Sequence, residues 1–260
     1  MSLFLSSLPL WLSTLLVIVL PTLVAMAGPV VVRRKFGLRR LTSNNEIAGF
    51  KFATVGVIYA VLVAFAIIVV WQRFNDAEVA VLQEAGAAVK IYRLAAGPEP
   101  NVAATREALD RYLQLAIDKD WRQMETGQES EEANAALNTL YAAATRVSKK
   151  GLLSTAITEE IFDQLDSITQ ARRSRLHLAD GMVPDILWVV LFTGAMLTIG
   201  FTFFFGTESL SAQVLMTGIL SVMVLMGLLV IISVDHPFTG PVHVDTEPLD
   251  HALADFRRGV

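Results

Sequence analysis

The stretch Gly49–Trp71, GFKFATVGVIYAVLVAFAIIVVW, decides the fold of this chain. After Lys51 it carries no charged side chain, and the next charge along the sequence is Arg73. A helix of about 20 mostly apolar residues crosses a bilayer, because each residue adds about 1.5 Å against a hydrocarbon core about 30 Å thick. We therefore expect this stretch to form a transmembrane helix.

Three further segments meet the same criterion, and abrupt charges bound them. They run roughly from Leu8 to Val32, from Val183 to Phe205 and from Ala212 to Val234. The chain of 260 residues is 53% hydrophobic, and its apolar residues come in blocks separated by charged stretches, as in multi-span membrane proteins. Ala25-Met26-Ala27 resembles a signal-peptide cleavage site, but the basic leader is missing and the apolar run continues beyond it, so we expect a retained span. The sequence predicts an all-α, polytopic membrane protein with four transmembrane helices.

The order of these segments predicts four regions and an orientation. The first two spans and their connection occupy 1–71, an extramembrane helical domain 72–182, the last two spans 183–235 and a polar tail 236–260. The loop between the first and second spans is short and basic, whereas the residues before the first span include no Lys or Arg. Because short basic loops stay in the cytoplasm, this places both termini and the central domain on the outer side of the membrane. The arginines around 172–175 and 257–258 oppose this orientation.

The central domain is rich in Ala, Glu, Gln and Leu, which favour helix. We predict three breaks: at Gly97–Asn101, where two prolines stop one helix and Asn101 caps the next, near Thr126-Gly127, and at Lys149–Gly151. These breaks predict four helices, the first continuing out of the second span and the last leading into the third.

No enzymatic chemistry is indicated by the sequence. It contains no cysteine, no glycine-rich phosphate loop, no paired-histidine helix and no dinucleotide fingerprint. The histidines and aspartates of the tail have no regular ligand spacing, and a net charge of −4 with no extended basic patch does not favour nucleic acid. We predict no catalytic residue, no cofactor and no metal site.

Two stripes of small residues run along the spans at intervals of four. One consists of Gly56, Ala60 and Ala64 in the second span, and the other begins with Gly194, Thr198 and Thr202 in the third. Small residues let helix backbones approach closely, so helix packing is the default interpretation. The same smooth, uncharged surface would also suit the lining of a pore, and the sequence leaves that alternative open.

Several short motifs cover nearly the whole chain: Asn45–Phe50 before the second span, then Ala77–Val79, Glu84-Ala85, Tyr92-Arg93, Asp120–Met124, Arg172–Leu176, Pro184–Trp188 at the third span and His236–Gly240 after the fourth. Together they resemble the bestrophin-like family of bacterial four-span membrane proteins. Bestrophins proper are pentameric anion channels in which the second span lines the pore and the large domain is cytoplasmic. The outer placement predicted here departs from that plan, and no acidic calcium clasp of the bestrophin type is present.

The resemblance implies a homo-oligomeric anion channel in the lipid bilayer. On that analogy Lys51 would attract anions near the mouth, and Phe52 and Tyr59 would be candidates for an apolar constriction. The alternative is a non-catalytic accessory or scaffolding subunit whose helical domain docks onto partner proteins of a membrane complex. A homogeneous ring of identical chains would favour the channel, and a stable heteromeric complex would favour the scaffold.

Overall fold

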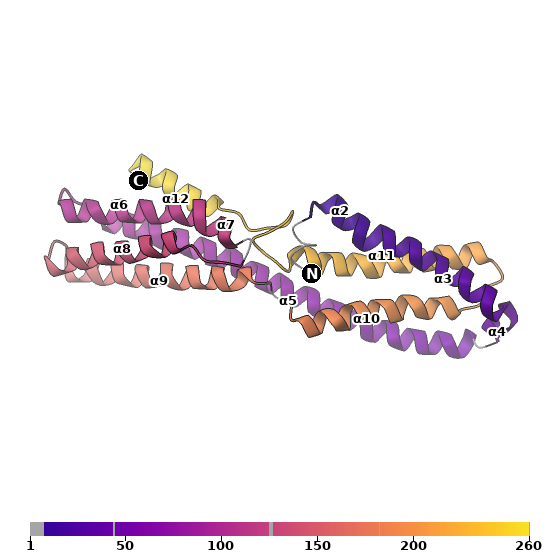
Figure 1. Cartoon of the computed structure of the whole chain (residues 1–260). Helices are drawn as coiled ribbons and strands as arrows, with labels where there is room; N and C mark the ends of the chain where they lie inside the picture. Colours follow the sequence, from indigo (N-terminus) through magenta and orange to yellow (C-terminus); the bar gives the residue numbers. More distant parts are fainter. Residues whose placement is uncertain (1–7, 44, 125–126, 182, 260) are drawn as a thin grey trace. The chain divides into compact units, whose positions relative to one another are not determined.

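A computed structural model of the chain describes residues 8–43, 45–124, 127–181 and 183–259 (Figure 1). Within these ranges the regular structure is helical throughout, with no strand. Four helices are long and apolar enough to cross a membrane: Leu10–Phe36, Asn45–Leu94, Asp185–Phe204 and Leu210–Val234. These helices agree with the four spans predicted from hydropathy.

Contacts divide the chain into two compact units. Unit 1 contains residues 1–72, 181–236 and 240–242, and unit 2 contains residues 73–180, 237–239 and 243–260. Helix α5, Asn45–Leu94, belongs to both units because it continues without a break beyond Trp71. The helix of the second span thus continues to Leu94, as predicted, whereas the placement of a domain outside the membrane stays a prediction.

Unit 1 contains the apolar helices. Its first span is built from α2 (Leu10–Thr14), the π-turn η1 (Leu15–Val19) and α3 (Leu20–Phe36), and the short basic helix α4 (Leu38–Thr42) leads towards α5. Unit 1 also contains α10 (Asp185–Phe201), the 3₁₀ turn η3 (Thr202–Phe204) and α11 (Leu210–Val234). Helix α3 packs along α11, where a Cβ on Gly218 would lie 3.1 Å from the Met26 sulfur. Glycine thus allows close helix contact at this level.

Side-chain hydrogen bonds join the start of α5 and the end of α3 to the loop between η3 and α11, at one end of the apolar helices. The Asn45 side chain donates to the Gly206 carbonyl at 2.6 Å and accepts from the Gly206 amide at 2.9 Å. Nearby, Arg33 donates from Nη1 to the Thr207 carbonyl at 3.1 Å. These bonds satisfy backbone groups that the ends of helices leave without a partner.

Unit 2 is a helical bundle. It contains the second part of α5, then α6 (Pro100–Leu115), the π-turn η2 (Ala116–Asp120), α7 (Trp121–Met124), α8 (Glu131–Lys149), α9 (Thr155–Ala179) and α12 (Glu247–Arg258). Breaks after Leu94 and after Lys149 agree with the predicted ones, and Gly151 has the positive φ of a helix stop. Thr126, predicted as part of the second break, lies outside the described residues, whereas the adjacent Gly127 has a φ of 70°.

Two details of unit 2 differ from the predictions. The N-cap of α6 is Glu99, with Pro100 in the first turn, so Asn101 lies inside the helix and the predicted Asn101 cap is wrong. Helix α9 ends at Ala179 and is followed directly by α10, as predicted. The tail predicted as merely polar contains the amphipathic helix α12, in which Phe256 stacks on Tyr92 with ring centroids 4.2 Å apart.

Candidate functional site

One side of the apolar half of α5 packs into unit 1. The ring of Tyr59 is buried, and its hydroxyl donates to the Leu191 carbonyl at 3.2 Å. The ring lies directly over Gly194, where a Cβ would come within 2.5 Å of it. Ala66 and Val70 follow Tyr59 on the same buried side, at helical spacing. This side therefore fixes how α5 is rotated against α10.

Phe52 also lies on the inner side, in a cluster of aromatic rings. Its ring centroid is 5.9 Å from that of Phe201 and 5.6 Å from that of Phe205, the latter in an edge-to-face arrangement. Aromatic pairs favour such offset geometries. The structure thus places Phe52 and Tyr59, the two predicted constriction residues, against the helices of their own chain. Whether either gates a pore stays a prediction.

The opposite side of α5 is covered by none of the described residues of unit 1. Its large side chains are extensively exposed, with Phe50 at 78%, Val57 at 64% and Ile68 at 53%. Beside them, Ala60 and Ala64 are exposed, and a Cβ on Gly56 would meet no atom within 4 Å. The first predicted small-residue stripe therefore makes no close contact with other helices in the part of the chain that the structure describes. We call Phe50, Val57, Val61, Ala64 and Ile68 the open face of α5.

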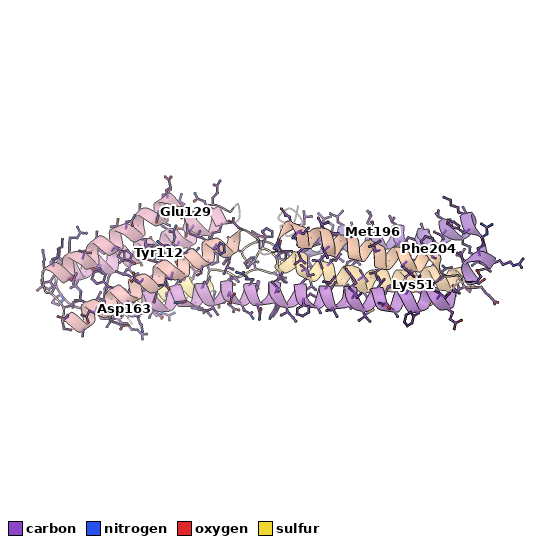
Figure 2. The ribbon with its side chains drawn as sticks, turned by 90° about the horizontal axis from the view of Figure 1, so that it is seen from below. Lys51, Tyr112, Glu129, Asp163, Met196 and Phe204 are labelled. Atoms are coloured by element: carbon purple, nitrogen blue, oxygen red, sulfur yellow. The ribbon has the colours of Figure 1, made fainter. Side chains whose placement is uncertain are left out.

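Lys51 is exposed at the first turns of α5 and forms no ion pair with any residue that the structure describes. Figure 2 shows it at the same end of unit 1 as Phe204. A cation that no carboxylate neutralises keeps its full attraction for anions in the water nearby.

The small-residue stripe of α10 lies in helix contacts inside unit 1. Gly194 meets Tyr59, and Thr198 is 3% exposed. Thr202 donates to the Ile199 carbonyl at 2.6 Å, and its hydroxyl lies 3.4 Å from that of Thr217 on α11. Hydroxyl groups between apolar helices are commonly bonded in this way. The packing role assigned to these residues stays a prediction.

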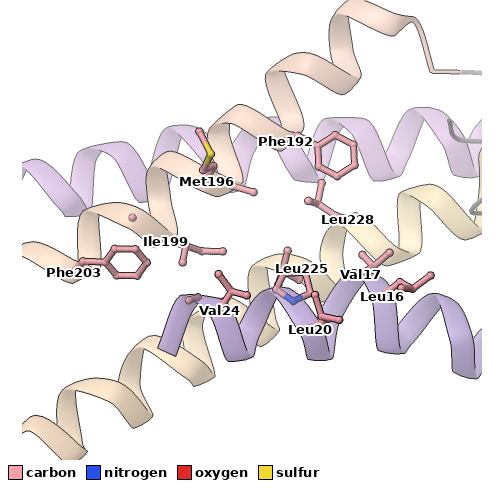
Figure 3. A pocket seen from close by; sticks show the side chains of 14 residues that line it. Leu16, Val17, Leu20, Val24, Phe192, Met196, Ile199, Phe203, Leu225 and Leu228 are labelled. Atoms are coloured by element: carbon pink, nitrogen blue, oxygen red, sulfur yellow. The ribbon is translucent and has the colours of Figure 1, made fainter. Parts of the chain in front are cut away.

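An apolar groove of about 710 Å³ opens between η1, α3 and α10 over α11 (Figure 3). Its walls include Leu20, Val24, Met196 and Phe203, and its floor is formed by Leu225 and Leu228. The lining residues are all apolar, so this groove offers an ion no replacement for its hydration shell. It suits hydrocarbon rather than a permeating ion.

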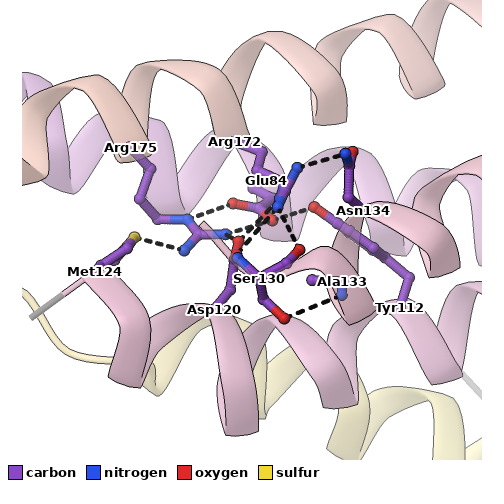
Figure 4. Close-up of polar contacts among 9 residues, drawn as sticks. All are labelled: Glu84, Tyr112, Asp120, Met124, Ser130, Ala133, Asn134, Arg172 and Arg175. Atoms are coloured by element: carbon purple, nitrogen blue, oxygen red, sulfur yellow. Dashed lines mark hydrogen bonds and ion pairs between the residues drawn. The ribbon is translucent and has the colours of Figure 1, made fainter. Parts of the chain in front are cut away.

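A buried cluster of charges holds unit 2 together (Figure 4). Arg175 donates to Glu84 at 2.9 and 3.2 Å and to Asp120 at 3.2 Å. Arg172 donates to both oxygens of Asp120 at 2.9 and 3.0 Å, and the Tyr112 hydroxyl donates to Glu84 at 2.6 Å. Two carboxylates thus balance two guanidinium groups, all of them buried. The cluster links α5, α6, η2 and α9.

The protonation states of this cluster follow from its surroundings. Burial raises the pKa of Tyr112 well above 10.0, and the charge of Glu84 raises it further, so the phenol keeps its proton and donates. Burial alone would raise the pKa of Asp120, but the hydrogen bond from Arg172 and the charges of Arg175 and Arg172 outweigh it. The pKa of Asp120 is therefore held below its ordinary value of 3.8.

Unit 2 is expected to lose stability in acid through Asp120. A carboxyl whose pKa is lowered by folding stabilises the protein above its unfolded pKa, near 4, and this contribution disappears as the pH falls through the folded pKa. Urea unfolding followed by circular dichroism between pH 7 and pH 3 measures it. Asp120→Asn should be less stable at pH 7 and lose less on acidification, whereas an equal acid response in both proteins would contradict the role of Asp120.

Sequence reasoning did not identify this cluster. Asp120 and the arginines of 172–175 stand in motifs that carry the family resemblance, but nothing in their spacing pairs them with Glu84. Among the described residues, no group of three or more His, Asp or Glu side chains is arranged to hold a metal ion.

The sequence of this chain matches a known family of membrane proteins. The Bestrophin-like domain family matches residues 19–249. The chain belongs to this family. The resemblance expected from the sequence is therefore confirmed, and the chain is a Bestrophin-like membrane protein. No curated protein sequence matches it significantly.

Solved structures of a bacterial bestrophin homologue from Klebsiella pneumoniae share the fold. One such structure aligns with a TM-score of 0.70 at 16% identity, over 93% of this chain and 96% of the other. Two variants of that homologue, each with one substitution, give TM-scores of 0.71 and 0.69 at 15% identity. They cover 93% of this Bestrophin-like chain and 97% and 96% of their own lengths. At this identity the likeness concerns the fold alone.

Proposed function

We propose that this Bestrophin-like protein is a homo-oligomeric anion channel of the bacterial inner membrane, in which the open face of α5 lines a shared axis. The observation that carries the proposal is the open face itself, since unit 1 leaves Phe50, Val57 and Ile68 uncovered while packing the opposite side of the same helix. Membership of the family supports the same conclusion. The role is non-catalytic.

Two features favour copies of the chain over lipid as the neighbours of α5. Ala60 and Ala64 are exposed beside Gly56, which has open space where a side chain would lie, so a neighbouring α5 could approach closely. The open face also carries no charge, so an anion could pass without binding tightly. Lys51 would then raise the local concentration of anions at one mouth.

Unit 2 is placed outside the membrane in this proposal, on the extracytoplasmic side. The basic residues of the connection between the first two spans support this orientation. Phe52 and Tyr59 lie on the packed side of α5, away from the open face, so they would affect the pore indirectly. Their contacts with Phe201 and Leu191 fix the rotation of α5, so a change in either residue would turn the pore surface.

Anion flux through the purified protein in liposomes tests the proposal. We expect a reversal potential that favours chloride over potassium, and Lys51→Glu should lower the permeability ratio by up to about thirtyfold. That size follows because one charge pair in water is worth about 1 kcal/mol at 4 Å and the substitution reverses the charge. Lys51→Arg is the matched control and should retain the ratio.

The alternative function gives a different result in the same preparation. A scaffolding subunit would carry no flux, and a stable assembly with other proteins after mild extraction would support it. An unchanged permeability ratio in Lys51→Glu would contradict the role of Lys51 even if flux is present.

A further inference from the structure

A polar cleft of about 480 Å³ lies between α8 and α9 in unit 2. Asn134, Asn138 and Tyr141 line it from α8, at spacings of four and three that place them along one side of the helix. Asp166, Thr169 and Arg173 line it from α9 in the same way, and Glu129 lies just before α8. Most clefts that bind small molecules are largely apolar with a few polar groups, whereas this lining is mainly polar. The cleft therefore suits a polar ligand.

Two guanidinium groups give the cleft its positive part. Arg173 is exposed on α9 and forms no ion pair or hydrogen bond with any residue in the described ranges. Arg172 is almost completely buried at the floor of the cleft. Its Nη1 lies 3.4 Å from the Asn134 side-chain oxygen, which is a long contact. That distance exceeds an ordinary N–H···O bond of 2.7–3.2 Å, so a carboxylate could compete for this donor. Arginine donors arranged in this way recognise a carboxylate.

Two carboxylates give the cleft its negative parts. Asp166 accepts a hydrogen bond from the Tyr141 hydroxyl at 2.9 Å, and the same hydroxyl lies 2.9 Å from that of Thr169. Glu129 is exposed and forms no ion pair among the described residues. A dianion would be repelled by these acids and a simple cation by the arginines. A molecule that carries both an ammonium and a carboxylate meets complementary charges.

We propose that the cleft between α8 and α9 binds a small zwitterion with an ammonium and a carboxylate group, such as a free amino acid. The carboxylate bonds to Arg173 and to Arg172 at the floor. The ammonium lies towards Asp166 or Glu129, and the amides of Asn134 and Asn138 supply further donors and acceptors.

The floor of the cleft connects this site to α5. Arg172 bonds to Asp120, which also accepts from Arg175, and Arg175 in turn bonds to Glu84 on α5. A ligand carboxylate that draws on Arg172 therefore competes for a group within the buried charge cluster. An effect of the ligand on ion flux rests on the proposed channel function, whereas binding can be measured without it.

Isothermal titration of the full-length protein in detergent tests the site. The probes are L-serine, L-glutamine and L-lysine, with acetate and methylammonium as single-charge controls, each up to about 10 mM. We expect at least one amino acid to saturate with a Kd below about 1 mM and to bind more tightly than either control. Arg173→Gln should weaken this binding by about tenfold or more, because a charge-assisted hydrogen bond is lost.

Arg111→Gln is the matched control, since Arg111 is an exposed arginine of α6 that does not line the cleft. It should bind the amino acid as the wild type does. The proposal is overturned if none of the amino acids saturates, if acetate alone binds equally tightly, or if the two arginine variants lose binding equally. Channel activity plays no part in these outcomes, so the binding site and the proposed function can fail separately.

Discussion

Arg175→Met is expected to lower the free energy of unfolding of unit 2 by about 3–5 kcal/mol, the loss typical of breaking a buried ion pair from one side. Arg175 bonds to both Glu84 and Asp120, and its side chain is completely buried. Its removal leaves Glu84 with the Tyr112 hydroxyl as its side-chain partner among the described residues, and no guanidinium bonded to Glu84 there compensates its charge. Urea unfolding followed by Trp121 fluorescence measures the loss, since the Trp121 ring lies 5.2 Å from the guanidinium carbon.

A double variant separates two contributions to this loss: the uncompensated charge of Glu84 and the lost packing of the Arg175 side chain. Adding Glu84→Gln to Arg175→Met removes the uncompensated carboxylate, so the double variant should regain part of the lost stability. A loss below about 1 kcal/mol in Arg175→Met, or a double variant less stable than the sum of its parts, would contradict this account of the cluster.

Gly206→Val is expected to destabilise unit 1 by about 1–3 kcal/mol, the usual size of overpacking in a close contact. A Cβ at this position would lie 2.6 Å from the Thr42 amide nitrogen and 2.9 Å from the Leu41 carbonyl carbon. Both are backbone atoms, so no side-chain rotation relieves the clash. The shift would also strain the two bonds between Asn45 and Gly206, which fix the start of α5. Thermal unfolding in detergent measures the effect.

Gly200→Ala is the control for this substitution. Gly200 lies on α10, and a Cβ there would meet no atom within 4 Å. It should be neutral or slightly stabilising, because alanine favours helix over glycine by about 1 kcal/mol. Equal losses in the two glycine variants would show that the clash at Gly206 does not limit the stability of unit 1.

The existence of the four spans could be predicted from sequence because bilayer thickness imposes a length and a composition on each helix independently of its neighbours. The helix breaks at Gly97–Asn101 and at Lys149–Gly151 could be predicted equally well, since proline and glycine act on the local backbone. Asn101 failed as a cap because Pro100 already occupies the first turn of α6. Helix α12 was missed because its short apolar pattern stands in a polar tail.

The buried charge cluster and the orientation of α5 could not be predicted, because both depend on contacts between distant segments. Glu84 and Arg175 stand 91 positions apart, and either would pass as an exposed charge on an isolated helix. The second span is apolar on all sides, so its sequence does not show which side is packed. Only the contacts of Phe52 and Tyr59 reveal that Val57 and Ile68 lie on the open face.

In the proposed homo-oligomer, the open face of α5 lies around an axis shared with other copies of this chain. Because the chain contains no cysteine, single-cysteine variants report on this arrangement cleanly. A bifunctional thiol reagent tolerates a wider spacing than the 4.4–6.8 Å between Cα atoms of a disulfide, so it suits residues around a pore. Ala66→Cys, on the buried side of the same helix, provides the control.

Cross-linking of Val57→Cys in native membranes is the most direct test of this claim. The account predicts a product of twice the 28.4 kDa chain mass for Val57→Cys and Val61→Cys, and only monomer for Ala66→Cys. Val57→Cys and Val61→Cys that remain monomeric, or that link only to other proteins, would contradict a homo-oligomer built around α5.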